Sequence, residues 1–149
     1  MAKQKIRRKV QQKKKNNFLL WGVIALVVLG GVVWFIARGT ATTGNLPHEI
    51  SVADALAKEN AGAFILDVRQ PDEWNEFHIA GSTLIRLDQL SSRLNELPKD
   101  QEIVVVCRTG HRSAEGRDIL LRAGFTQVTS MAGGLTQWKA VGYATVSGP

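Results

Sequence analysis

The chain has few of the side chains that build disulfides and metal centres. Its 149 residues include one cysteine, Cys107, and three scattered histidines, His48, His78 and His111. A single cysteine excludes an intrachain disulfide, and together with three dispersed histidines it supplies no cluster with the spacing of metal ligands. The sequence therefore predicts no metal site and no cofactor. It also contains no internal repeat.

Acidic residues are missing from the first part of the chain. None of the 13 aspartates and glutamates lies at or before Arg38, whereas residues 1–17 carry eight lysines and arginines. Residues 18–37 then contain no charged side chain, and as a helix they would be about 30 Å long, the thickness of the hydrocarbon core of a bilayer. Trp21 and Trp34 lie near the two ends of this run, where indole rings favour the membrane interface. These features predict a basic tail at 1–17 and a transmembrane helix at 18–37.

The basic tail also predicts the orientation of that helix. Under the positive-inside rule, the N-terminus stays in the cytoplasm and the rest of the chain is extracytoplasmic, as in a single-pass membrane protein. A core helix would need a polar face, which residues 18–37 lack. A cleaved signal peptide is an alternative, because the small residues Gly39, Thr40 and Ala41 follow. Secretion signals usually have an apolar run of about 7 to 15 residues, which favours the uncleaved anchor.

The basic character is confined to this terminus. The chain has a formal net charge of +6, but residues 39–149 carry 10 basic and 13 acidic side chains, a net charge of −3. A polybasic run beside a spanning segment is explained by topology and by contact with anionic lipid. We therefore expect the chain to bind the membrane through residues 18–37 and not to bind nucleic acid.

Residues 38–47 read as a linker, and residues 48–149 are enough for one domain with one core. Buried or short strands are predicted at 63–68, 83–85, 103–106 and 128–131, separated by helical segments. The predicted helices cover 52–59, 70–77, a segment capped by Asp88 that carries Leu90, Leu94 and Leu97, 112–123, and a segment after Gly133 and Gly134 that carries Leu135, Trp138 and Val141. This alternation predicts an α/β fold, a small open parallel sheet flanked by helices. Ligands bind to such sheets at the carboxyl ends of the strands.

Cys107 comes directly after the most strongly predicted strand, Ile103 to Val106. Polar residues and Gly110 follow, and then the helix of residues 112–123 begins. A short loop between a strand and a helix N-terminus turns several backbone N–H groups toward one point. Arg108 and Arg112 add two positive charges, which favour the thiolate, the nucleophilic form of cysteine. The sequence therefore predicts a reactive cysteine instead of a structural one.

Asp67 and Arg69 follow the strand predicted at 63–68 and belong to the same end of the sheet. They fit either a contribution to the site or an ion pair that orders the cysteine loop from behind. Glu73 and His78 are interpreted as structural, and Trp138 as a packing residue.

These residues resemble the rhodanese-like sulfurtransferases, specifically the single-domain ones. The resemblance covers residues 48–146 and rests on four motifs in the family's order: Asp67-Val68-Arg69; Glu73 with His78-Ile79-Ala80-Gly81; Cys107 to Arg112 followed by Ser113; and Gly133-Gly134-Leu135 with Trp138. Ser82 and Arg86 are small departures, where the family usually has alanine and often proline.

The resemblance implies that Cys107 takes a sulfane sulfur from thiosulfate or a similar anionic donor as a persulfide. It passes the sulfur to cyanide or a thiol acceptor. The implied donor-binding residues are those of the loop, Arg108, Thr109, Gly110, His111 and Arg112. The resemblance implies neither a cofactor nor an oligomeric state.

Two other functions are alternatives for a cysteine in such a loop. Cysteine phosphatases and arsenate reductases need a longer loop, with arginine six positions after the cysteine, and Ser113 stands at that position. A non-catalytic binding or redox-sensing module is the second alternative, against which the cysteine and its neighbouring arginines argue.

Overall fold

The computed structural model describes residues 46–149, and strand β4 (Ile103–Val106) lies at the centre of their fold. All four residues of β4 are buried. Ile103 and Val105 pack into one apolar cluster, whereas Val104 and Val106 pack into another on the opposite face of the sheet. Side chains of a strand alternate between its faces, so β4 is covered on both sides. This confirms the prediction from its run of β-branched residues.

The sheet has five parallel strands. They are β1 (Glu49–Ile50), β2 (Phe64–Asp67), β3 (Thr83–Leu84), β4 and β5 (Val128–Met131), arranged in the order β1-β5-β4-β2-β3. Parallel neighbours need crossover connections, and helices supply most of them. The α/β class and the parallel sheet are therefore as predicted.

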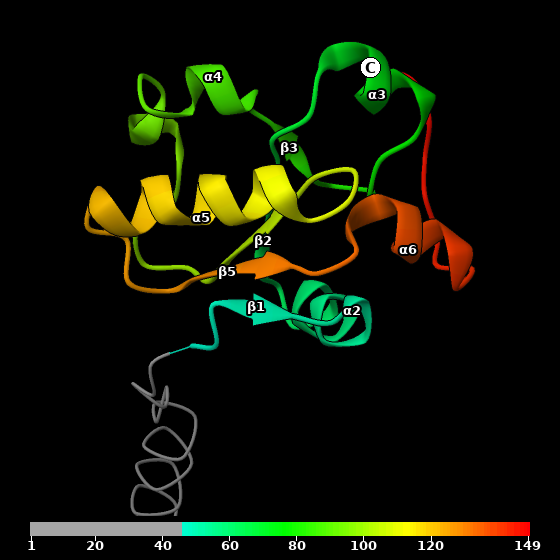
Figure 1. Ribbon diagram of the computed structural model, residues 1–149, viewed down its shortest axis with the longest axis horizontal. Helices are drawn as coiled ribbons and strands as arrows, with labels where there is room; N and C mark the ends of the chain where they lie inside the picture. The colour runs from blue at the N-terminus through cyan, green and yellow to red at the C-terminus, as the bar shows by residue number, and fades with distance from the viewer. Residues whose placement is uncertain (1–45) are drawn as a thin grey trace, which may run out of the picture. The chain divides into compact units, whose positions relative to one another are not determined.

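Helices cover both faces of this sheet (Figure 1). They are α2 (Val52–Asn60), α3 (Pro71–Glu76), α4 (Leu87–Leu90), the 3₁₀ turn η1 (Leu94–Glu96), α5 (His111–Arg122) and α6 (Gly134–Ala140). Helices α4 and α5 pack into the cluster that contains Val105. Helices α2 and α6 pack into the cluster that contains Val104, where Trp138 is 1% exposed. The packing role predicted for Trp138 is confirmed.

Two features of the local structure differ from the predictions. Strand β1 was not foreseen, because two residues carry too little pattern; it pairs with β5, and the amide of Ala132 donates to Ile50 O at 2.8 Å. The helix expected over Leu90 and Leu97 is broken into α4 and η1. Between them Ser92 Oγ donates to Gln89 O at 2.8 Å, a serine bond to the backbone that competes with helix continuation.

The ends of two helices also differ from expectation. Asp88 does not cap α4: Arg86 occupies the cap position, and the Asp88 carboxylate pairs with it from the first turn. Val141 follows the end of α6 and is 50% exposed, so it does not belong to the buried stripe.

The C-terminal segment returns to α3 (Figure 1). His78 and Val146 exchange two backbone hydrogen bonds, at 2.8 and 2.9 Å, and the amide of Gly148 donates to Asn75 O at 3.0 Å. Trp138 Nε1 donates to Ala144 O at 3.0 Å, which fastens the same segment to α6. Helix α3 is only six residues long, and these contacts hold it beside the end of β2.

The predicted transmembrane segment at 18–37 lies outside the residues that the structure describes. Within residues 46–149, no helix has the length and apolar character needed to cross a bilayer.

Candidate functional site

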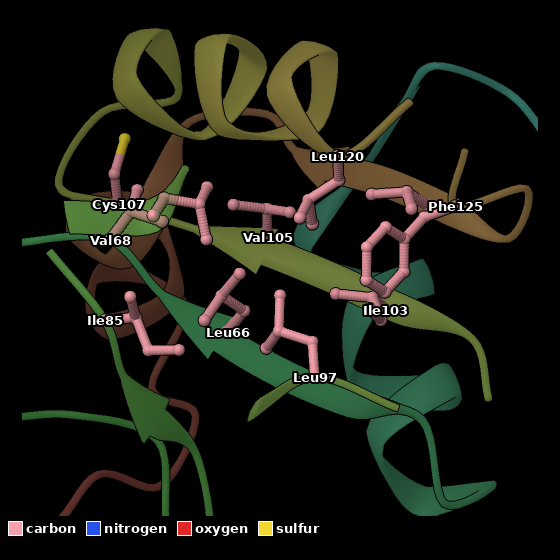
Figure 2. Packing of buried hydrophobic residues seen from close by; sticks show 11 residues of the cluster. Leu66, Val68, Ile85, Leu97, Ile103, Val105, Cys107, Leu120 and Phe125 are labelled. Carbon is pink, nitrogen blue, oxygen red and sulfur yellow. The ribbon is translucent and has the colours of Figure 1, made fainter. Parts of the chain in front are cut away.

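Cys107 lies at the carboxyl edge of the sheet, directly after β4. In the register of the sheet, Val106 is opposite Asp67, and the amide of Val68 donates to Val106 O at 3.0 Å. The ends of two adjacent parallel strands therefore bring Cys107 and Asp67 together. Cys107 is 1% exposed, and its sulfur points away from the neighbouring side chains of the apolar cluster (Figure 2).

The first turn of α6 orients the start of the cysteine loop. The amide of Leu135 donates to Cys107 O at 2.8 Å, and the amide of Thr136 donates to Arg108 O at 3.0 Å. In a trans peptide the C=O and N–H groups point in opposite directions. The N–H groups of Arg108 and Thr109, which share these two peptide units, are therefore turned away from α6.

Gly134 makes this close approach possible. A Cβ atom added to Gly134 would lie 2.5 Å from the Arg108 carbonyl carbon and oxygen and from Cys107 O. Gly134 also has a φ of +57°, a conformation that side chains disfavour. Only glycine fits at this position without moving the loop.

The other end of the loop supplies a hydrogen bond to the sulfur. Gly110 adopts a φ of +108°, and its amide donates to Cys107 Sγ at 3.1 Å. The amides of Arg108 and Thr109 in the loop, and of His111 and Arg112 at the start of α5, donate to no acceptor within the described residues. Beside the cysteine, the loop thus has N–H groups that are available to bind an anion.

Ser113, which stands at the position where phosphatases have arginine, is also a neighbour of the sulfur. Its hydroxyl is buried, lies 3.6 Å from Cys107 Sγ and donates to Gly110 O at 2.7 Å. A hydroxyl can donate one hydrogen bond and also accept others. It therefore accepts from the thiol while bracing the backbone of the loop. Its place on the first turn of α5, six residues after the cysteine, was the available signal.

Glu73 binds the two arginines of the loop from α3. Its carboxylate accepts from Arg112 Nη1 at 2.7 Å and from Arg112 Nη2 at 2.8 Å, and Arg108 Nη1 lies 3.9 Å away. The hydrogen bonds from Arg112 lower the pKa of the Glu73 carboxyl and raise the pKa of Arg112. The structural interpretation of Glu73 from sequence missed this contact. The signal was an acidic side chain at the start of the helix that follows the neighbouring strand.

Asp67 and Arg69 form a buried ion pair: Asp67 is 0% exposed and Arg69 is 1% exposed. Arg69 Nε donates to both carboxylate oxygens at 3.0 and 2.8 Å, and Nη2 lies 2.7 Å from Oδ2. Burial raises the pKa of Asp67, against the hydrogen bonds and charge of Arg69. The same guanidinium donates to Glu73 O at 3.0 Å and to Phe77 O at 2.7 Å. Arg69 therefore ties α3, and with it Glu73, to the end of β2.

The two remaining residues of the predicted site, Thr109 and His111, are exposed. Neither side chain makes a hydrogen bond within the described part of the chain. No group of three potential metal ligands occurs among residues 46–149.

The described domain is similar to known proteins. Residues 51–141 match the family described as the rhodanese-like domain. A thiosulfate sulfurtransferase of Stutzerimonas stutzeri, GlpE, is 34% identical over 85 residues, which are 57% of this chain and 78% of that protein. A probable adenylyltransferase/sulfurtransferase of Mycobacterium tuberculosis, MoeZ, is 40% identical over 76 residues, which are 50% of this chain but only 19% of that protein.

Among solved structures, a rhodanese-related protein of Thermoplasma volcanium superposes with a TM-score of 0.62 at 31% identity, covering 67% of this chain and 98% of that one. The family match spans most of the described residues, with Cys107 and its loop inside it. The chain therefore belongs to the family of rhodanese-like domains.

Proposed function

We propose that this domain is a sulfurtransferase that carries a sulfane sulfur as a persulfide on Cys107. The observation that carries the proposal is the loop itself. The amide of Gly110 donates to Cys107 Sγ at 3.1 Å, and the amides of Arg108, Thr109, His111 and Arg112 have no acceptor within residues 46–149. Such donors stabilise a thiolate, a persulfide anion and the oxygens of an anionic donor.

The first half-reaction takes sulfur from thiosulfate or a donor of similar chemistry. The Cys107 thiolate attacks the sulfane sulfur, a new S–S bond forms, and the S–S bond of thiosulfate breaks. The electron pair of the broken bond leaves with sulfite, so a persulfide anion and sulfite dianion replace a thiolate and a thiosulfate dianion. N–H groups that reduce the repulsion between these anions lower the activation barrier.

The second half-reaction returns the enzyme to its starting state. A thiolate or cyanide attacks the outer sulfur of the persulfide, the bond between that sulfur and Cys107 Sγ breaks, and its electron pair remains on Sγ as the thiolate. With no second cysteine in the chain, the acceptor is a separate molecule.

The sulfur interpretation is favoured over phosphoryl transfer by the residue at the sixth position after the cysteine. Ser113 stands there, is buried, and contacts both the sulfur and the loop backbone. It cannot supply the two parallel N–H donors with which an arginine binds a phosphoryl group. A non-catalytic module would not transfer sulfur from thiosulfate to cyanide with turnover.

Intact-mass measurement of the purified full-length chain tests the proposal. After thiosulfate treatment, the chain should gain the mass of one sulfur atom, and cyanide should remove it. Cys107→Ser keeps the side-chain size and should show no gain. Sulfate, which has no sulfane sulfur, is the matched control. Transfer to cyanide by Cys107→Ser would refute the proposal, and hydrolysis of aryl phosphates without persulfide formation would support the phosphatase alternative.

We also propose that residues 18–37 anchor the chain, with the N-terminus cytoplasmic and the domain extracytoplasmic. The 20-residue uncharged run and the basic residues before it support this. The full-length chain should stay with membranes after an alkaline carbonate wash, and an impermeant thiol reagent should label Cys107 in intact cells. Labelling only after lysis would indicate the opposite orientation, with the domain in the cytoplasm. Release of a shortened chain would indicate a cleaved signal.

A further inference from the structure

We infer that Glu73 sets the donor preference of the site: by neutralising part of the positive charge at the loop, it disfavours dianionic sulfur donors relative to singly charged persulfide donors. This inference rests on the proposed sulfurtransferase function. It concerns a residue outside the cysteine loop, on α3, whose side chain is 13% exposed.

The contacts of Arg112 are the first argument. Both of its terminal nitrogens donate to Glu73, at 2.7 and 2.8 Å, in the parallel arrangement that arginine makes with a carboxylate. Thiosulfate would offer the same kind of oxygens to the same two nitrogens. A thiosulfate anion can therefore accept from both terminal nitrogens of Arg112 in this paired arrangement only by displacing Glu73.

The charge of the cluster is the second argument. Arg108 and Arg112 carry two positive charges, and the Glu73 carboxylate cancels one of them. The hydrogen bonds from Arg112 also lower the pKa of Glu73, so this negative charge is present at neutral pH. Arg108 is the more available cation, because its side chain is 59% exposed and its distance to Glu73 is 3.9 Å. Arg108, Arg112 and Glu73 together thus offer one net positive charge to a donor that brings two negative ones.

A purely structural role for Glu73 makes a different prediction. Its carboxylate also accepts from the amide of Gln70 at 3.3 Å, in a capping box at the start of α3. If Glu73 acted only by holding α3 and Arg112 in place, its removal would impair every donor alike. The ratio of kcat/KM for two sulfur donors that differ in charge therefore distinguishes the two roles.

The experiment compares Glu73→Gln with the unaltered full-length chain. Glutamine keeps the length of the side chain and one acceptor oxygen but removes the charge. We expect the ratio of kcat/KM for thiosulfate to kcat/KM for the singly charged persulfide of 2-mercaptoethanol to rise by about three- to tenfold, mainly through a lower KM for thiosulfate. Glu76→Gln makes the same charge change on the same helix, at an exposed residue whose side chain makes no ion pair within residues 46–149. It should leave the ratio unchanged.

A second measurement does not depend on sulfur transfer. Iodoacetate and iodoacetamide have nearly the same size, but iodoacetate carries one negative charge. The alkylation rate of Cys107 with iodoacetate, divided by its rate with iodoacetamide, therefore reports the local potential at the sulfur. Glu73→Gln should raise this ratio about two- to fivefold, and high salt should reduce the change.

The two measurements distinguish the possible failures. An unchanged alkylation ratio together with an unchanged donor ratio would overturn the inference. An equal fall in kcat/KM for both donors, in a variant with lowered thermal stability, would overturn it as well. If neither donor forms a persulfide, the proposed function fails, and the alkylation ratio alone then decides whether Glu73 controls the charge at Cys107.

Discussion

Replacing Gly134 with alanine tests whether the first turn of α6 holds the cysteine loop in place. The added Cβ atom would lie 2.5 Å from three backbone atoms, the Arg108 carbonyl carbon and oxygen and Cys107 O. Backbone atoms cannot rotate away as a flexible side chain can. The loop and the helix must therefore separate by about 1 Å to reach an ordinary contact distance.

Three contributions set the size of the effect. The positive φ of Gly134 costs an alanine about 1–2 kcal/mol, and overpacking of this kind costs about 1–3 kcal/mol. Separation also weakens the bonds from Leu135 and Thr136 to the loop carbonyls, each with a net value of about 1 kcal/mol. Gly124 is a matched control because it also has a positive φ, +88°, but a Cβ atom there would meet nothing within 4 Å. We expect a loss of about 4 kcal/mol for Gly134→Ala and about 1–2 kcal/mol for Gly124→Ala.

Denaturant unfolding and persulfide formation measure the two consequences. Unfolding followed by tryptophan fluorescence gives the difference in stability between the variants. The rate of persulfide formation by folded Gly134→Ala should fall about a hundredfold, because a 1 Å displacement of the loop misplaces its amides. Gly124→Ala should keep its rate. Equal loss of stability in the two variants, or a normal rate in Gly134→Ala, would show that the contact with α6 does not organise the loop.

Two further predictions concern the ion pairs beside the loop. Arg69→Ala should cost about 3–5 kcal/mol in denaturant unfolding, because it leaves the buried Asp67 carboxylate unpaired. Adding Asp67→Asn should recover part of that loss, and no recovery would mean that the damage comes from the freed carbonyls of α3 instead. The ion pair of Glu73 and Arg112 predicts that the stability of the fold depends on pH. The pKa of Glu73 is lower in the folded state than its unfolded value of about 4.5. The stability that Glu73 contributes is therefore fully present above the unfolded pKa and is lost as the pH falls through the folded pKa. The stability of Glu73→Gln should change less over the same acid range, and parallel pH curves would contradict this.

Local sequence was sufficient to predict the centre of the fold. The apolar run that ends at Val106 is short and rich in β-branched residues, which favours a strand buried on both faces, and β4 is buried in that way. Cap residues mark other elements in the same local way: Ser51 accepts from the amide of Asp54 at the start of α2. The placement of Cys107 and Asp67 at one edge followed, since parallel strands carry their carboxyl ends to the same side.

Local sequence was insufficient where an element is short or its pattern is mixed. Strand β1 consists of two residues and owes its existence to pairing with β5, a contact between distant segments. The stripe that contains Leu90 and Leu97 was correctly predicted to be buried, but as one helix. Periodicity reports which side chains face the core, and a helix followed by a 3₁₀ turn satisfies it as well as a continuous helix does.

The environment of the cysteine was decided by tertiary structure. Glu73 has a sufficient local role as part of a helix cap, so nothing in its own segment shows that it also binds Arg112 of α5. In the same way, Gly134 is a plausible helix start in isolation, whereas its fit against the carbonyls of Cys107 and Arg108 exists only after α6 packs on the loop. The sequence by itself determined the strand, the position of Cys107 at its end and the order of the loop residues that follow, because these are neighbours along the chain. Which charges and carbonyls surround the sulfur depends on contacts between segments far apart in the sequence, and only folding brings them together.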